Sequence, residues 1–239
     1  MKKQIAVARR ILGMNARNLL FIRPHNTRGA VRLARDKLET KQRLLENNLP
    51  TAELFGTIRN REELYGFDWD SLPNSFVLKP NAGLGGNGIL IVYGKTKDGK
   101  WITGDQETYT IDDLRLRVSN ILDGNYSISN IPDTAYFEQR LRLSEDFKNI
   151  SYKGIPDIRV IVFNSVPVMA MLRLPTKASG GKANMALGGL GVGIDLASGV
   201  TTFATSKYLG ELSTHPDYNT SLRGVLIPYW EEILRVSIE

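Results

Sequence analysis

The residues with the clearest chemical meaning lie in residues 78–92, LKPNAGLGGNGILIV, where a lysine precedes a loop of closely spaced glycines. The lysine is Lys79, and the glycines are Gly83, Gly85, Gly86 and Gly88. Backbone without side chains can approach phosphate oxygens and present N–H groups to them, and the lysine adds a positive charge. The segment therefore predicts a phosphate-binding loop, although an ordinary glycine-rich turn has the same composition.

Three familiar kinds of phosphate loop do not fit the residues that follow. Gly83, Gly85 and Gly88 match G-x-G-x-x-G, but a dinucleotide-binding loop must open a helix. Here the next run, ILIVY at residues 89–93, is typical of a strand. The loop does not close with Gly-Lys-Ser/Thr as a P-loop does, and neither H-R-D nor D-F-G follows, as in protein kinases. A flexible hairpin with a glycine-rich turn remains.

The loop is one of several motifs whose order and spacing resemble those of the ATP-grasp ligases. Within them, the chain is most similar to the alpha-L-glutamate ligase-like proteins, relatives of enzymes that add glutamate to a ribosomal protein. The resemblance covers nearly the whole chain. The motifs are DK at 36–37, FVLKP at 76–80, the glycine loop, YFEQRL at 136–141 and DIRVIVF at 157–163, supported by GMN at 13–15, FIRP at 21–24, VPVMAMLRLPTKAS at 166–179 and GVGIDL at 191–196.

The resemblance implies an ATP site in the first half of the chain. Lys37 and Lys79 match the two lysines that neutralise ATP phosphates, and the glycine loop matches the lid over them. Glu138, with Gln139 and Leu141, matches the hinge that recognises adenine and ribose. The alternative for each lysine is a solvated residue at the end of a helix or strand, and for Glu138 an outward-facing strand residue.

The same resemblance implies a site for the acid substrate in the second half. Arg159 and Arg173 match residues that meet phosphate or an acyl phosphate, for which a planar guanidinium is suited. A structural ion pair between Arg159 and Asp157 is the alternative. Lys182 and Asn184 match the substrate loop, but this chain reads Met-Ala-Leu at 185–187 where related proteins place a histidine-containing stretch.

The expected cofactors are ATP and Mg²⁺, and the metal ligands are the main departure from the family pattern. ATP-grasp ligases carry an E-x-N pair in a C-terminal segment, whereas this chain reads WEEILRVSIE at 230–239 with no E-x-N near it. Glu231 and Glu232 lie in a helical pattern suited to solvent. We therefore expect no metal ligand in this chain and a missing segment, which a second polypeptide would supply in a split enzyme.

Apolar periodicity and turn residues predict the elements that must position these residues. Helices are expected at 1–18, 26–35, 36–47 and 110–122, the last with a capping box of Thr110 and Asp113. Strands are expected at 52–58, 75–79, 88–93, 134–141, 157–163, 167–174, 191–197 and 200–204. We predict an α+β, ATP-grasp-type fold of antiparallel sheets with helices packed on them. The expected parts are a basic N-terminal helical region (1–50), a glycine-loop subdomain (51–135) and a second, C-terminally incomplete subdomain (136–239).

Composition excludes several other classes of site. The 239 residues include no cysteine, which excludes disulfides and thiolate metal sites. The two histidines are too few for a multi-histidine metal centre of the common kind. Arg9 and Arg10 interrupt the first apolar run too early for a secretory signal, and no apolar run is long enough for a membrane span. We therefore expect a cytoplasmic protein.

The positive charge of the chain is concentrated at its N-terminus. Residues 1–43 contain twelve Lys or Arg and two acids, whereas the rest of the chain is net negative; the total is +6. Such a field attracts nucleic acid, anionic membrane surfaces or acidic substrates. The alternative is a pair of solvated basic helices, since runs of charge usually lie on the surface. Aromatic residues are not interleaved with these basic residues as stacking on nucleic acid would require, so nucleic-acid binding is the least favoured reading.

These patterns lead to one principal hypothesis and one alternative. The principal hypothesis is an ATP-dependent carboxylate–amine ligase that works through an acyl phosphate and adds glutamate. Its expected partners are ATP, a carboxylic acid and an amine, and the acid and the amine can both be amino acids. The alternative is a noncatalytic nucleotide-binding module or one half of a split enzyme.

Overall fold

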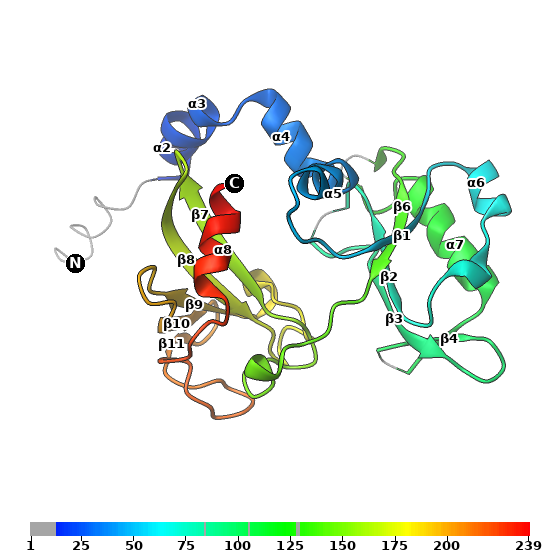
Figure 1. Cartoon of the computed structure of the whole chain (residues 1–239). Helices are drawn as coiled ribbons and strands as arrows, with labels where there is room; N and C mark the ends of the chain where they lie inside the picture. The colour runs from blue at the N-terminus through cyan, green and yellow to red at the C-terminus, as the bar shows by residue number, and fades with distance from the viewer. Residues whose placement is uncertain (1–12, 84, 105, 128–129) are drawn as a thin grey trace. The chain divides into compact units, whose positions relative to one another are not determined.

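The computed structural model describes residues 13–83, 85–104, 106–127 and 130–239, which form two compact units, Met1–Arg140 and Leu141–Glu239 (Figure 1). The helix expected at residues 1–18 falls mostly outside the described residues. The three-part division expected from the sequence stays a prediction. Each unit is described separately below.

Short helices open the first unit. They are α2 (Met14–Ala16), η1 (Arg17–Ile22), α3 (Arg23–His25), α4 (Arg28–Arg35) and α5 (Lys37–Glu46). Thr27 accepts a hydrogen bond from the Ala30 N–H at 3.1 Å and so caps α4, and Asp36 caps α5 by accepting from the Glu39 N–H at 2.9 Å. Both helices predicted from the sequence at 26–35 and 36–47 are therefore confirmed.

A sheet of six antiparallel strands forms the centre of the first unit, in the order β1-β6-β2-β3-β4-β5. Its buried side chains pack against those of α7 (Ile111–Leu122), which begins at the predicted capping box of Thr110 and Asp113. The strands are β1 (Leu54–Ile58), β2 (Phe76–Pro80), β3 (Leu90–Lys95), β4 (Trp101–Thr103), β5 (Thr108–Tyr109) and β6 (Ala135–Gln139), with α6 (Arg61–Gly66) and η2 (Trp69–Ser71) between β1 and β2.

The second unit is built on a five-stranded antiparallel sheet in the order β11-β10-β9-β8-β7. Helix α8 (Trp230–Ile238) packs on β7 and β8 (Figure 1). The strands are β7 (Asp157–Phe163), β8 (Val166–Leu174), β9 (Leu190–Ile194), β10 (Thr201–Ser206) and β11 (Gly210–Leu212), with η4 (Glu145–Phe147) before them and η5 (Met185–Leu187) between β8 and β9.

The β7–β8 hairpin contains a bulge that sets which side chains face the core. Its turn is Asn164-Ser165, both with positive φ as a tight hairpin turn requires. Val162 pairs with Pro167 but Ile161 pairs with Met169, so Val168 is an extra residue on β8. Side chains alternate along a strand. With Val168 unpaired, the residues of β8 beyond it therefore face the opposite way from a strand that pairs without a bulge.

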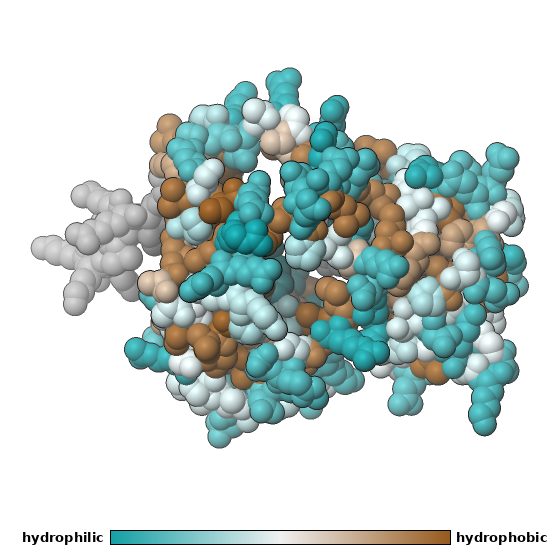
Figure 2. Space-filling model, in the orientation of Figure 1, coloured by the Kyte–Doolittle hydropathy of each residue, from teal (hydrophilic) through white to brown (hydrophobic). Residues whose placement is uncertain are grey.

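The two sheets confirm the α+β class with antiparallel sheets and packed helices. Every strand predicted from the sequence is present within a few residues, whereas β4, β5, β11 and α6 were not predicted. Figure 2 shows hydrophobic residues among the hydrophilic ones on the surface of both units. Throughout the described ranges, every helix is too short or too polar to cross a bilayer.

A buried histidine anchors a loop of the second unit. The His215 ring is fully buried, with Nε2 3.3 Å from the Pro175 carbonyl oxygen and Nδ1 accepting from the Asp217 N–H at 3.2 Å. These partners define a neutral ring with its proton on Nε2, since a protonated Nδ1 cannot accept. Burial lowers the pKa of His215, and the Pro175 and Asp217 contacts only partly oppose that shift.

This lowered pKa predicts acid destabilisation. Below the ordinary histidine pKa of about 6.5, His215 binds a proton in the unfolded chain but not in the folded chain. The free energy of unfolding therefore falls as the pH drops from about 7 to 5. Urea denaturation at several pH values should show this loss in the wild type and less of it in His215→Gln. Equal slopes in the wild type and His215→Gln would contradict the prediction.

Candidate functional site

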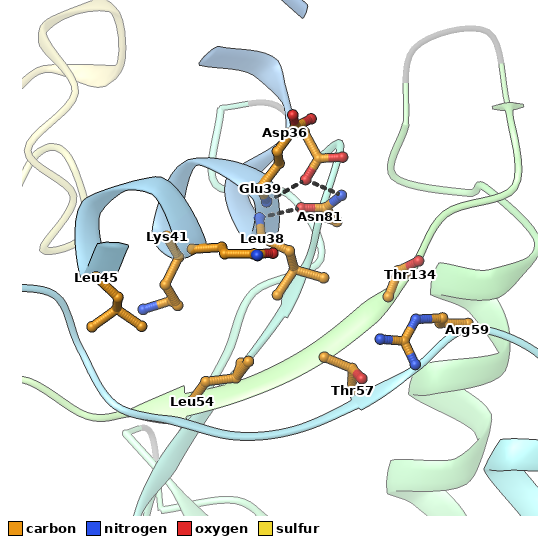
Figure 3. A pocket seen from close by; sticks show the side chains of 11 residues that line it. Asp36, Leu38, Glu39, Lys41, Leu45, Leu54, Thr57, Arg59, Asn81 and Thr134 are labelled. Atoms are coloured by element: carbon orange, nitrogen blue, oxygen red, sulfur yellow. Dashed lines mark hydrogen bonds between the residues drawn. The ribbon is translucent and has the colours of Figure 1, made fainter. Parts of the chain in front are cut away.

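The start of α5 is docked onto the glycine loop. The Lys37 ammonium group donates hydrogen bonds to the carbonyl oxygens of Asn81 and Gly83 at 2.6 and 2.9 Å. The Asn81 side chain accepts from the Leu38 N–H at 2.9 Å and donates to Asp36 at 3.0 Å (Figure 3). Helix and loop are thus joined by bonds in both directions, and these bonds fix the position of Lys37.

The glycines of the loop serve two different structural needs. Gly88 has a φ of +78°, and a Cβ there would lie 2.6 Å from the Tyr126 ring, so a larger residue does not fit. Gly85 and Gly86 also have positive φ, but nothing lies within 4 Å of a Cβ at either position. The turn therefore consists of open, exposed backbone at Gly85 and Gly86 and a tightly packed base at Gly88.

Lys79 lies in a buried ionic group that we call the lysine–glutamate cluster, consisting of Lys41, Lys79 and Glu138. One carboxylate oxygen of Glu138 pairs with the Lys79 ammonium group, and the other lies 3.0 Å from that of Lys41. Glu138 is only 6% exposed. Lys41 also donates to the hydroxyl of Thr51 at 2.9 Å and to the carbonyl of Ala52. Glu138 therefore has both oxygens occupied by lysines.

Lys37 and Lys79 line the same cavity, of about 210 Å³. Burial lowers the pKa of Lys37; the charge of Lys79 acts in the same direction, while Asp133 and Asp36 oppose the shift. The two ammonium groups are therefore close enough to repel one another, and a bound anion would relieve that repulsion. The other residues that line this cavity are Ala34, Thr40, Lys41, Leu44, Thr51, Tyr136 and Glu138.

A second cavity, of about 510 Å³, lies between α5 and β1 (Figure 3). Its lining includes Leu38, Leu45 and Leu54, so it is more apolar than the first. Lys41 lines both cavities. The side of α5 that faces the sheet is therefore hollowed in two places, with the lysine–glutamate cluster beside both.

The expected nucleotide hinge lies at the end of the first unit. Gln139 is exposed; its N–H donates to the Glu53 carbonyl at 2.8 Å, and its side chain accepts from the Glu53 N–H at 3.4 Å. Leu141 is 54% exposed and is the first residue of the second unit. The hinge roles of Gln139 and Leu141 stay predictions, because neither side chain joins the lysine–glutamate cluster.

In the second unit, Arg173 is already paired. It lies directly across from Asp157 in the β7–β8 ladder and binds that carboxylate with two donors, Nε at 2.5 Å and Nη2. The alternative ion pair between Arg159 and Asp157 is therefore wrong. Arg159 is exposed on the same face of β7 as Asp157, opposite Met171, and has no ion-pair partner among the described residues.

The substrate loop expected around Lys182 is anchored at its base. The Thr176 hydroxyl donates to the Gly188 carbonyl at 2.9 Å and accepts from the Ser179 N–H at 3.0 Å. Asn184 accepts from the Ala186 N–H at 3.0 Å and so caps η5, whereas the Lys182 side chain is exposed. The Lys182 side chain is thus open to solvent, and the substrate roles of Lys182 and Asn184 stay predictions.

The resemblance implies a magnesium ion, but the part of the chain that the structure describes contains no set of ligands for it. Over those ranges, no three His, Asp or Glu side chains gather in an arrangement that could hold a metal ion. The carboxylate nearest the lysines, Glu138, already carries two ammonium partners and does not fit a metal ligand.

Lys41 is the site residue that the sequence reading missed. A signal was present: Leu38, Lys41 and Leu45 are spaced three and four residues apart, so they share one helical face. A lysine on an otherwise apolar face is expected to have a buried partner. The partner, Glu138, lies 97 positions further along the chain and could not be identified from this local pattern.

Comparison with known families gives a match over most of the chain. A family model described as "Sugar-transfer associated ATP-grasp" matches residues 16–239. Searches of curated proteins and of solved structures returned no match. The match extends over both compact units and over all the candidate site residues.

Proposed function

Because the chain belongs to the sugar-transfer associated ATP-grasp family, we propose that it is an ATP-dependent carboxylate–amine ligase. Membership suggests ATP-dependent, ligase-like activity in general. Amide formation is our inference, and glutamate is the first acid to test because of the sequence resemblance described above.

The observation that carries this proposal is the pair of lysines around one cavity beside the glycine loop. Lys37 uses two of its three donors on loop carbonyls, which leaves one for a ligand. Lys79 reaches the same cavity from β2, and Gly85 and Gly86 provide open backbone in the loop. Two cations and unobstructed backbone N–H groups are the parts that a triphosphate needs.

The proposed reaction has two steps. A carboxylate oxygen of the acid attacks the terminal phosphorus of ATP, the bond to the bridging oxygen breaks, and ADP leaves. The amine nitrogen then attacks the acyl carbon, the bond between that carbon and the phosphate oxygen breaks, and phosphate and a proton are released as the amide forms. Lys37 and Lys79 would stabilise the phosphate charge in the first step.

Residues of the second unit are proposed to act on the acid and the acyl phosphate. Arg159 is the best of these candidates, because its guanidinium is exposed and has no ion-pair partner among the described residues. Arg173 would have to share its donors with Asp157 or exchange that partner for a ligand. Lys182 and Asn184 are proposed to contact the acid or the amine.

Trapping the acyl phosphate tests the proposal most directly. Hydroxylamine replaces the amine and converts an acyl phosphate into a hydroxamate, which gives a colour with ferric iron. The full chain with ATP, Mg²⁺, glutamate and hydroxylamine should form hydroxamate and ADP in equal amounts. Omission of glutamate should abolish both products, and a panel of other carboxylic acids extends the test if glutamate is inert.

Two outcomes would change the assignment. ADP formation that does not depend on any acid would contradict a ligase. ATP binding by calorimetry without turnover for any acid would favour the alternative, a noncatalytic nucleotide-binding module, because the same lysines and glycine loop suffice for binding alone. Failure to bind ATP would reject both functions.

A further inference from the structure

A third cavity, of about 420 Å³, lies between α3 and α4 and is lined mainly by arginines. We call it the arginine cavity. Its volume is in the range of small-molecule sites. Its lining includes Ile22, Arg23, Arg28, Val31, Arg32 and Arg35.

The charge in this cavity is uncompensated by the described part of the chain. Residues 13–35 contain five arginines and no acid. In the described ranges, Arg23, Arg28, Arg32 and Arg35 form no ion pair, whereas Arg43, Arg59, Arg61 and Arg173 each have an acidic partner. Figure 2 shows a mainly hydrophilic surface along the upper edge of the view, where Figure 1 places α4.

Local hydrogen bonds define where one wall of the cavity ends and the other begins. The Asn26 side chain donates to the Ile22 carbonyl at 2.8 Å and closes α3, and Thr27 caps the start of α4. Arg28 and Arg32 are four residues apart on α4 and so lie on one face of it. The guanidinium groups therefore surround a cavity whose backbone is already in place.

Helix α4 also links the arginine cavity to the proposed ATP site. Ala34 lines the cavity that contains Lys37 and Lys79, while Val31, Arg32 and Arg35 line the arginine cavity. Only Asp36 separates α4 from α5. One helix of two turns is thus a wall of both cavities.

We propose that the arginine cavity binds the non-reacting carboxylates of a polycarboxylate substrate; this inference rests on the ligase function proposed above. Guanidinium groups bind carboxylates through two parallel hydrogen bonds. A monocarboxylate, which has two oxygens, would leave at least two of the four arginines without a partner, so a ligand with several carboxylates fits better. Ile22 and Val31 give its carbon chain an apolar contact.

Calorimetry with tricarballylate, a plain tricarboxylate, tests the proposal on the full chain without ATP or Mg²⁺. Binding should weaken by about tenfold or more in Arg28→Gln/Arg32→Gln, as expected for loss of charge-assisted hydrogen bonds. Arg23→Gln, on the opposite wall, should also weaken it. The matched control, Arg43→Gln/Lys97→Gln, removes two exposed charges elsewhere and should bind as the wild type does.

Several results would overturn the inference. They are absence of tricarballylate binding to the wild type, equal weakening in the control, and no effect of Arg23→Gln. Pyrophosphate that binds at this cavity in place of tricarballylate would overturn the choice of carboxylates. ATP binding measured on the same variants separates the two proposals, since it tests the function and should be unchanged by these substitutions.

Discussion

Replacing Lys79 with methionine is expected to weaken ATP binding by roughly 10- to 100-fold, the loss of one charge-assisted hydrogen bond of about 1.5–3 kcal/mol. Lys79 is one of three lysines that line the cavity of about 210 Å³, and methionine keeps most of its length without the charge. The fold should survive, because Glu138 keeps Lys41 at 3.0 Å. The other two lysines cannot compensate, since two donors of Lys37 hold the glycine loop and Lys41 is bound to Glu138, Thr51 and Ala52.

Calorimetric titration with ATP, with and without Mg²⁺, measures this effect. Lys95→Met is the matched control, because Lys95 lies on β3 with its ammonium group 3.9 Å from the centre of the Trp101 ring, away from the cavity. It should bind ATP as the wild type does. Unchanged affinity in Lys79→Met would remove Lys79 from the site and, with it, the main support for the proposed function.

Glu138→Ala should lower the free energy of unfolding by about 3 kcal/mol, the usual cost of breaking a buried ion pair. The substitution leaves the ammonium groups of Lys41 and Lys79 facing one another without a counter-charge. Lys79 is 28% exposed along its side chain and can turn partly to water, so the unpaired charge of Lys41 causes most of the loss. Glu138→Gln should cost less, because its amide oxygen still accepts from one lysine.

Urea denaturation of Glu138→Ala and of four further variants measures this loss and separates its contributions. Lys41→Met and Glu138→Gln should each destabilise the fold, and the double variant should lose less than the sum of the two, because its members share one interaction. Glu62→Ala, an exposed glutamate on α6, serves as the control and should change stability by less than about 0.5 kcal/mol. Strict additivity would mean that the pair of Lys41 and Glu138 contributes no coupling.

Local signals predicted much of the fold. Thr110 and Asp113 form the predicted capping box at the start of α7. The expected strands at 157–163 and 167–174 pair as β7 and β8, and the strand after the glycine loop excludes a dinucleotide-binding loop, as expected. These features depend on a few neighbouring residues, so the chain specifies them locally.

Contacts across the sheet could not be predicted in the same way. The lysine–glutamate cluster requires β2 to pair with β6 and α5 to pack beside them, so residues from three distant segments must meet. The ion pair of Asp157 was assigned to its neighbour on the same strand, Arg159, because strand register is not visible in a single sequence. The regular register from the Asn164-Ser165 turn would have placed Leu172, not Arg173, opposite Asp157.

The extra residue at Val168 gives this hairpin one position at which it can lose a residue during evolution. Removing Val168 would remove the bulge, but Met169 would still pair with Ile161 and Arg173 with Asp157. Leu172 and Leu174 would therefore stay in the core. Homologous hairpins that keep the pairing of Asp157 with Arg173 should thus tolerate a difference of one residue at this point of β8, which an alignment of such hairpins can check.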